Sequence, residues 1–120
     1  MPEAEPDLVV TLRPHPGGPC LMSVSGELDY HTAAQLRAGL EEVPLDQGVS
    51  LIIDLSRLTY CDSTGISILV GADHQAKASG ATLVLAGMNA HIARVFHVIG
   101  LDQVFTCYDT VDAASRALRI

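Results

Sequence analysis

Four consecutive residues of this chain form a motif that is typical of a helix start and contains reactive groups: Asp62, Ser63, Thr64 and Gly65. An acidic or hydroxyl side chain just before a helix accepts a hydrogen bond from a backbone N–H group that would otherwise be unpaired. A hydroxyl in the first helical turn also lies where these N–H groups and the helix dipole stabilise a phosphate. The motif therefore fits two interpretations: a plain helix cap formed by Asp62 or Ser63, or a serine that accepts a phosphoryl group.

The motif lies between a predicted strand and a predicted helix. The run Val49–Leu55 is almost continuously apolar, which is typical of a strand buried on both faces of a sheet. Leu58 and Tyr60 follow in a predicted loop, and a helical pattern then covers Ile66–Ser79. The sequence therefore predicts that Ser63 comes directly after the central strand, at the start of a helix.

The predicted helix has an apolar face and a charged face. At about 100° per residue, the residues that share the apolar face are Gly65, Ile68, Leu69, Ala72 and Ala76. The opposite face, which we expect to contact water, carries Asp73, His74 and Lys77. Ile66 and Val70 fall among these charged residues. They indicate either a broad apolar stripe that a neighbouring helix partly covers, or an apolar patch beside Ser63 that a partner covers.

The rest of the chain alternates between strand and helix patterns. Further strands are predicted at Leu8–Arg13, Cys20–Ser25, Thr82–Ala86 and Val104–Cys107, with a turn at Pro14–Pro19. Further helices are predicted at 33–43 after a cap at Asp29 or Thr32, at 90–99 after a cap at Asn89, and at 111–118 after a cap at Asp109 or Thr110. The order β-β-α-β-α-β-α-β-α predicts an α/β fold, with a mixed sheet of four to five strands, an antiparallel first strand and about four helices.

Composition limits the classes of partner. A net charge of −7 argues against a nucleic acid or an anionic membrane surface as the main partner. No apolar run approaches the roughly 20 residues that span a bilayer, and no signal-peptide pattern opens the chain. The three cysteines, Cys20, Cys61 and Cys107, are widely spaced and fit reduced thiols better than a disulfide framework or a zinc site. We therefore expect a small cytoplasmic domain at residues 8–120, preceded by a disordered acidic tail at 1–7.

Motifs that would support an enzyme are missing. A hydrolase with Ser63 as its nucleophile would be expected to carry a G-x-S-x-G motif, and none occurs. A receiver domain that is phosphorylated on Asp54 would need a late lysine, but the only lysine is Lys77, in the wrong element. No glycine-rich phosphate loop or metal-ligand spacing is present. We predict no catalytic residue, no cofactor and no metal.

Three segments resemble the STAS domains, and specifically the bacterial anti-sigma factor antagonists: Gly26-Glu27-Leu28-Asp29, Leu51-Ile52-Ile53-Asp54-Leu55 and Asp62-Ser63-Thr64-Gly65. The spacing between them fits this family, and Val95-Phe96 followed by Gly100-Leu101 resembles its late helix. The resemblance covers roughly residues 8 to 118 and implies a single-domain STAS-like fold.

The resemblance implies a binding protein that phosphorylation switches off. The unphosphorylated form would bind an anti-sigma factor that is also a serine kinase using ATP and Mg²⁺, and would thereby free a sigma factor. Phosphorylation of Ser63, or less readily of Thr64, would end the binding, and a metal-dependent serine phosphatase would restore it. The implied partner surface comprises Asp29, Asp62, Ser63, Thr64, Gly65, Ile66 and Val70. A STAS module of another signalling assembly and a small hydrolase using Ser63 stay open, and the oligomeric state is not predicted.

Overall fold

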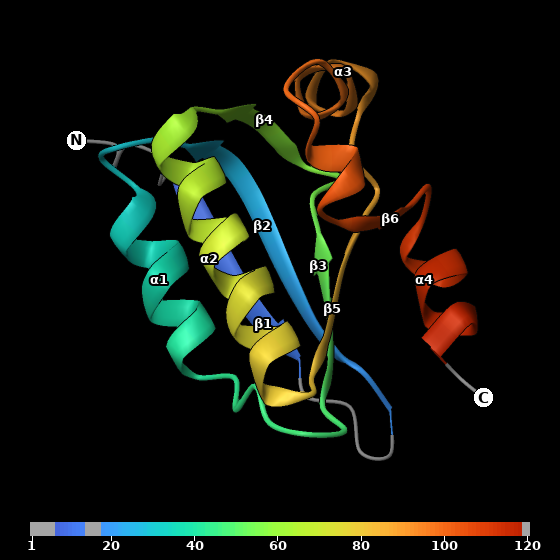
Figure 1. Ribbon diagram of the computed structural model, residues 1–120. Helices are drawn as coiled ribbons and strands as arrows, with labels where there is room; N and C mark the ends of the chain where they lie inside the picture. Colours follow the sequence, from blue (N-terminus) through green and yellow to red (C-terminus); the bar gives the residue numbers. More distant parts are fainter. Residues whose placement is uncertain (1–6, 14–17, 119–120) are drawn as a thin grey trace.

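The computed structural model describes residues 7–13 and 18–118 of the 120-residue chain (Figure 1). The predicted acidic tail, except for Asp7, and most of the predicted turn at Pro14–Pro19 fall outside these residues. The strands are β1 (Leu8–Arg13), β2 (Cys20–Leu28), β3 (Ser50–Asp54), β4 (Leu58–Cys61), β5 (Thr82–Ala86) and β6 (Thr106–Tyr108). The helices are α1 (Ala33–Glu41), α2 (Ser63–Ser79), α3 (Ala90–Val98), α4 (Val111–Leu118) and the short 3-10 helix η1 (Leu101–Gln103).

The strands form one mixed sheet in the order β1-β2-β3-β5-β6, with β4 paired to β2. β1 is antiparallel to β2, with Leu8 opposite Gly26, and the other pairs are parallel. The predicted mixed sheet with an antiparallel first strand is confirmed. The predicted loop at Leu58 and Tyr60 is wrong, because these residues belong to β4. β2 extends to Leu28, beyond the part that pairs with β3, and β4 pairs with this extension.

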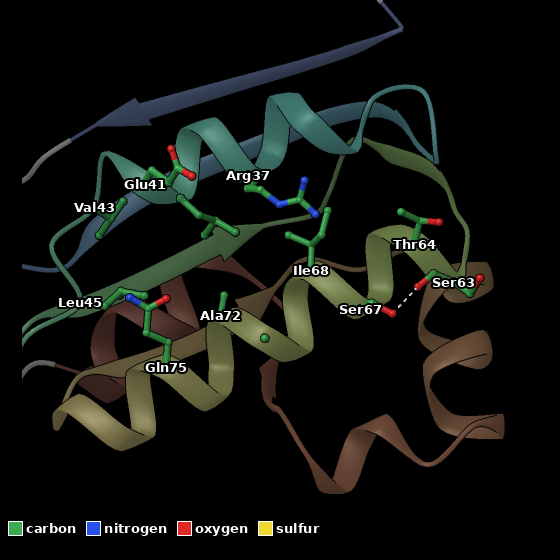
Figure 2. Close-up of a pocket in the computed structure, with 12 residues that line it drawn as sticks. Arg37, Glu41, Val43, Leu45, Ser63, Thr64, Ser67, Ile68, Ala72 and Gln75 are labelled. Atoms are coloured by element: carbon green, nitrogen blue, oxygen red, sulfur yellow. Dashed lines mark hydrogen bonds between the residues drawn. The ribbon is translucent and has the colours of Figure 1, made fainter.

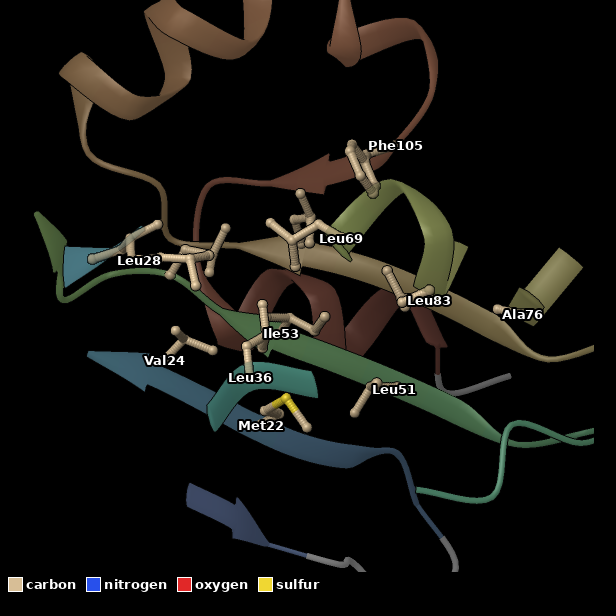
Figure 3. Close-up of a cluster of buried hydrophobic side chains, with 14 of the residues drawn as sticks. Met22, Val24, Leu28, Leu36, Leu51, Ile53, Leu69, Ala76, Leu83 and Phe105 are labelled. Atoms are coloured by element: carbon tan, nitrogen blue, oxygen red, sulfur yellow. The ribbon is translucent and has the colours of Figure 1, made fainter. Parts of the chain in front are cut away.

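The helices cover both faces of the sheet. α1 and α2 lie on one face and α4 on the other (Figure 1). The main core lies between the sheet and α1, α2 and α3, and includes Met22, Leu36, Ile53, Leu69, Leu83 and Phe105 (Figure 3). Ile52 points to the opposite face, where it forms a smaller cluster with Val84, Ala86 and Ala114 of α4. The continuous apolar run of the central strand therefore reflects burial on both faces, as predicted.

The predicted caps at Asn89 and Thr110 act where the sequence placed them, whereas the cap predicted for α1 at Asp29 or Thr32 forms no side-chain bond to that helix. The Oδ1 atom of Asn89 accepts a hydrogen bond from the N–H of Ile92 at 2.9 Å, and Thr110 Oγ1 accepts one from the N–H of Ala113 at 3.0 Å. Gly80 ends α2 in the left-handed conformation, with φ +77°. These signals involve only neighbouring residues, so they can be read from the sequence alone.

The segment after α3 differs from the prediction of a strand at Val104–Cys107. η1 precedes it, and the N–H of Phe105 bonds to the carbonyl oxygen of Leu101 at 2.9 Å. Phe105 is only 4% exposed and lies against Phe96, with 6.0 Å between the ring centroids. This turn places Phe105 in the core, and the strand β6 begins one residue later.

Asp73 of α2 is buried, although the helical pattern predicted that it would contact water. The residue is 2% exposed, and its Oδ2 lies 2.8 Å from the Nζ atom of Lys77. Lys77 also donates a hydrogen bond to the carbonyl oxygen of Val104 at 3.0 Å. The helix therefore buries part of its charged side as well, and the chain's only lysine joins α2 to the segment after η1.

Other general features concern the described residues alone. No helix among them is long and apolar enough to cross a bilayer. The three cysteines are free thiols, and no group of three potential metal ligands occurs within ranges 7–13 and 18–118.

We predict that Lys77→Met will destabilise the fold by about 1–3 kcal/mol, because it leaves the buried Asp73 carboxylate without its cation. Chemical denaturation measures this change in the free energy of unfolding. The double variant Asp73→Asn/Lys77→Met removes both charges and should recover part of the loss. If Lys77→Met alone unfolds at the wild-type denaturant concentration, the pair does not contribute to stability.

Candidate functional site

Asp62 holds the N-terminal end of α2. Its backbone is extended, and its Oδ1 accepts hydrogen bonds from the N–H groups of Thr64 at 2.9 Å and Gly65 at 3.1 Å. Its Oδ2 accepts a further bond at 3.1 Å from the N–H of Tyr30, in the loop between β2 and α1. Of the two caps that the sequence allowed, the fold therefore uses Asp62, which also joins α2 to that loop.

Ser63 is the first residue of α2, and its side chain is exposed. Among the described residues, its Oγ makes no hydrogen bond, whereas its carbonyl oxygen accepts one from Ser67 Oγ at 2.9 Å (Figure 2). Thr64 is half-buried. Ser63 is therefore the more accessible of the two hydroxyl groups, and modifying it would break no hydrogen bond in the described part of the fold.

Gly65 is buried beneath this helix start. A Cβ atom there would lie 2.5 Å from Cγ of Leu28 and 3.2 Å from Sγ of Cys61. Leu28 itself is completely buried. The first turn of α2 therefore packs on the end of β2 so closely that only glycine fits without a shift. Gly65 positions Ser63 and does not itself face solvent.

Asp29 lies in the loop that Asp62 contacts. Its Oδ1 accepts hydrogen bonds from the N–H groups of His31 at 2.9 Å and Thr32 at 3.1 Å. Thr32 is 3% exposed and donates its hydroxyl to the carbonyl oxygen of Glu27 at 2.8 Å. Neither side chain caps α1 itself, because Asp29 binds the turn before the helix and Thr32 makes no side-chain cap bond. The structure thus brings Asp29 and Asp62 into adjacent loops.

Ile66 and Val70 are half-buried and pack against the main core. Of the two interpretations of these residues, the structure favours the broad apolar stripe that other elements partly cover. A charge at Ile66 would therefore disturb the core as well as any partner surface.

Tyr30 gives the site its largest exposed apolar side chain, and the sequence analysis missed it. Its side chain is 75% exposed, although the Asp62 carboxylate holds its backbone beside the start of α2. Tyr60, on β4, is 48% exposed. The sequence feature that could have identified it is a tyrosine directly after Asp29, in an otherwise polar loop.

The thiol next to the motif is in a setting that disfavours its charged, nucleophilic form. Burial and, to a smaller extent, the charge of Asp62 raise the pKa of Cys61 to about 12. The thiol is therefore protonated at neutral pH, and its Sγ donates to the carbonyl oxygen of Asp62 at 3.6 Å.

A groove of about 680 Å³ runs between α1 and α2 (Figure 2). Ser63 and Thr64 line one end of this α1–α2 groove, and Leu45 lines the other. The exposed serine therefore lies at the mouth of a depression whose walls come from two helices.

The fold and the site have counterparts among known proteins. The family model described as "Mlab, STAS domain" matches residues 12–107, and the chain belongs to the STAS domain family. The prediction of the family and of its fold class from the sequence is therefore confirmed, with one strand more than expected.

The relatives of this chain within the family are regulatory proteins. It is 32% identical over 116 residues to the anti-sigma-F factor antagonist RsfB of Mycobacterium tuberculosis, covering 97% of this chain and 93% of that protein. It is 36% identical over 81 residues to the anti-sigma-B factor antagonist of Listeria monocytogenes, covering 68% and 71%. The crystal structure of an anti-sigma factor antagonist from Mycobacterium paratuberculosis superimposes with a TM-score of 0.81 at 28% identity, covering 98% of this chain and 100% of that one.

We predict opposite effects for two glycine substitutions in α2. Gly65→Ala should destabilise the fold by about 1–3 kcal/mol, because the new methyl group overlaps Leu28. Gly71→Ala is the matched control: its Cβ would meet nothing within 4 Å, so it should stabilise the helix by about 0.5–1 kcal/mol. Thermal and chemical denaturation of both variants measure these changes. Equal effects of the two substitutions would contradict the close packing of the first turn on β2.

Proposed function

We propose that this protein is an anti-sigma factor antagonist that acts in the cytoplasm and is switched by phosphorylation of Ser63. The observation that carries the proposal is the exposed hydroxyl of Ser63, which bonds to no other described residue and lies at a helix start that Asp62 caps. A kinase needs such a hydroxyl to be reachable and its surroundings to survive the modification. The chain's similarity to anti-sigma factor antagonists along nearly its whole length supports the same function.

The partner of the unphosphorylated form is an anti-sigma factor, and its binding frees the sigma factor. We infer that the same anti-sigma factor is a serine kinase, which transfers the γ-phosphoryl group of ATP to Ser63 with the help of Mg²⁺. A metal-dependent serine phosphatase then hydrolyses the phosphoserine and restores binding. In this cycle the protein is a ligand and a substrate, and Thr64 is a secondary acceptor because its side chain is half-buried.

The partner surface that we propose centres on the loop after β2 and the start of α2. Asp62 links these two segments through the N–H of Tyr30, so they present one continuous surface. Tyr30 supplies the exposed apolar area of this surface, and tyrosine is common among the residues that dominate the binding energy of protein interfaces. Asp29, Gly65, Ile66 and Val70 contribute mainly by shaping this surface, since each is buried or half-buried.

A hydrolase that uses Ser63 as its nucleophile finds less support. A serine nucleophile needs a base within hydrogen-bond reach. Among the described residues, no histidine bonds to Ser63 Oγ, and the neighbouring Asp62 carboxylate is engaged by three backbone N–H groups. Incubation with generic acyl and phosphoryl esters tests this alternative, because only an enzyme would turn them over.

The central test begins with the partner. A tagged form of the protein is purified from its native cell, and the bound protein is identified by mass spectrometry. The purified partner, ATP and Mg²⁺ should then add one phosphoryl group, which peptide mapping should place on Ser63. Ser63→Ala should bind the partner but accept no phosphate at that position.

Thr64→Ala is the matched control and should be phosphorylated as fully as the wild type. If Ser63→Ala is modified to the same extent as the wild type, the acceptor assignment is wrong. If the captured partner is neither an anti-sigma factor nor a kinase, the chain is a STAS module of another assembly.

A second test addresses the partner surface. Tyr30→Ala should weaken binding of the anti-sigma factor by at least about tenfold, because it removes an exposed aromatic anchor. Its midpoint of thermal unfolding should stay close to the wild-type value, since the side chain is 75% exposed. Val98→Ala is a control, because Val98 is 71% exposed but lies at the end of α3. Equal affinities of the two variants would place the interface elsewhere.

A further inference from the structure

Gly71 is a feature of α2 that the packing of the described residues does not explain. It lies in the interior of a helix of 17 residues, where glycine is about 0.5–1 kcal/mol less favourable than alanine. Gly65 and Gly39 are glycines because a Cβ atom would overlap Leu28 or Val10, whereas a Cβ atom at Gly71 would meet nothing within 4 Å. The open space above Gly71 is part of the α1–α2 groove.

The α1–α2 groove changes in polarity along its length. The hydroxyl residues Ser63, Thr64 and Ser67 line one end, Ile68 and Ala72 line the middle, and Val43 and Leu45 line the other end together with Glu41 and Gln75 (Figure 2). Its volume of about 680 Å³ is within the usual range for small-molecule sites, about 300–1,000 Å³. A molecule with a polar end beside these hydroxyl groups and an apolar body over the middle of the groove would therefore fit this lining.

The polar half of the groove also contains a positive charge. Arg37 extends from α1 toward α2, and in the view of Figure 2 its guanidinium group lies between α1 and the side chain of Ile68. In the described part of the chain, no carboxylate forms an ion pair with Arg37. Glu41, one helical turn further along α1, lies toward the end of the groove that Val43 and Leu45 line (Figure 2). An anionic group would therefore bind beside Arg37, on the side toward Ser67 and away from Glu41.

We propose that the α1–α2 groove binds a small amphipathic anion, with its negative group at Arg37 and its apolar body over Ile68 and Gly71. The three observations fit together: the groove has the required volume, its one cation lacks an internal partner, and a glycine keeps the wall open. The ligand class is an acyl chain or a comparable apolar skeleton that ends in a single carboxylate or similar anion. This proposal does not depend on the phosphorylation of Ser63.

Occupancy of the groove would connect the ligand to the site described above. Ser63 and Thr64 line the same groove, so a bound molecule would cover part of the surface that an anti-sigma factor must contact. This consequence rests on the proposed function, whereas the binding itself is tested on the isolated protein.

Decanoate is a suitable probe, used below its micelle concentration with the ¹⁵N-labelled protein. Saturable shifts should appear in the backbone amides of residues 37–45 and 63–75. 1-Decanol, which lacks the charge, should bind at least about fivefold more weakly, and Arg37→Gln should lower the affinity for decanoate by a similar factor. Arg94→Gln, an exposed arginine on α3, is the matched control and should bind like the wild type.

Gly71→Leu is the second variant, because its side chain would fill the groove from a position where a Cβ atom meets no other group. It should fold normally, as judged by its thermal midpoint, and should bind decanoate at least about tenfold more weakly. The proposal is overturned if decanoate does not bind saturably, or if its shifts fall outside the groove. It is equally overturned if Gly71→Leu binds like the wild type, or if Arg37→Gln and Arg94→Gln bind alike.

Discussion

The carboxylate of Asp62 is the interaction on which the candidate site depends. One of its oxygen atoms satisfies two N–H groups in the first turn of α2, and the other binds the loop after β2 through Tyr30. A cap usually stabilises only its own helix. Here the same group also holds a second segment in place. The positions of Ser63 and Tyr30 relative to each other are therefore fixed, although Asp62 and Tyr30 are 32 positions apart in the chain.

Packing beneath Asp62 enforces the same arrangement. The contact between Gly65 and Leu28 allows α2 to start directly on the end of β2, and β4 pairs with that end of the strand. Because Gly65 faces the buried strand, Ser63 is left at the surface. The exposure of the Ser63 hydroxyl is therefore a consequence of where the glycine must lie. Within this motif, Asp62 caps the helix, Gly65 makes the close contact with β2, and Ser63 is the acceptor that we propose.

The sequence predicted the order of the elements and most features that depend on neighbouring residues, and it missed several contacts between distant elements. The caps at Asp62 and Asn89 and the end of α2 at Ser79 involve residues within a few positions, and they were correct. The burial of Asp73 was missed because a helical pattern shows on which side of the helix a residue lies, but not which other elements pack against that side. Tyr30 was missed for a related reason: only the contact with Asp62 places it beside Ser63.

The same geometry determines what a phosphate on Ser63 could do. The N–H groups of Thr64 and Gly65 already bind Asp62, so they are not free to stabilise the phosphate as an uncapped helix start would. The phosphate would add about −1.5 to −2 charges next to this carboxylate. Because three N–H groups hold Asp62 and none of its bonds involves Ser63 Oγ, the cap can persist while the phosphate stays in water. The phosphate would then weaken binding at the moment when a partner removes that water, because dehydrating a dianion without cationic partners costs free energy. A switch of this kind acts on docking and leaves the fold of the free protein unchanged.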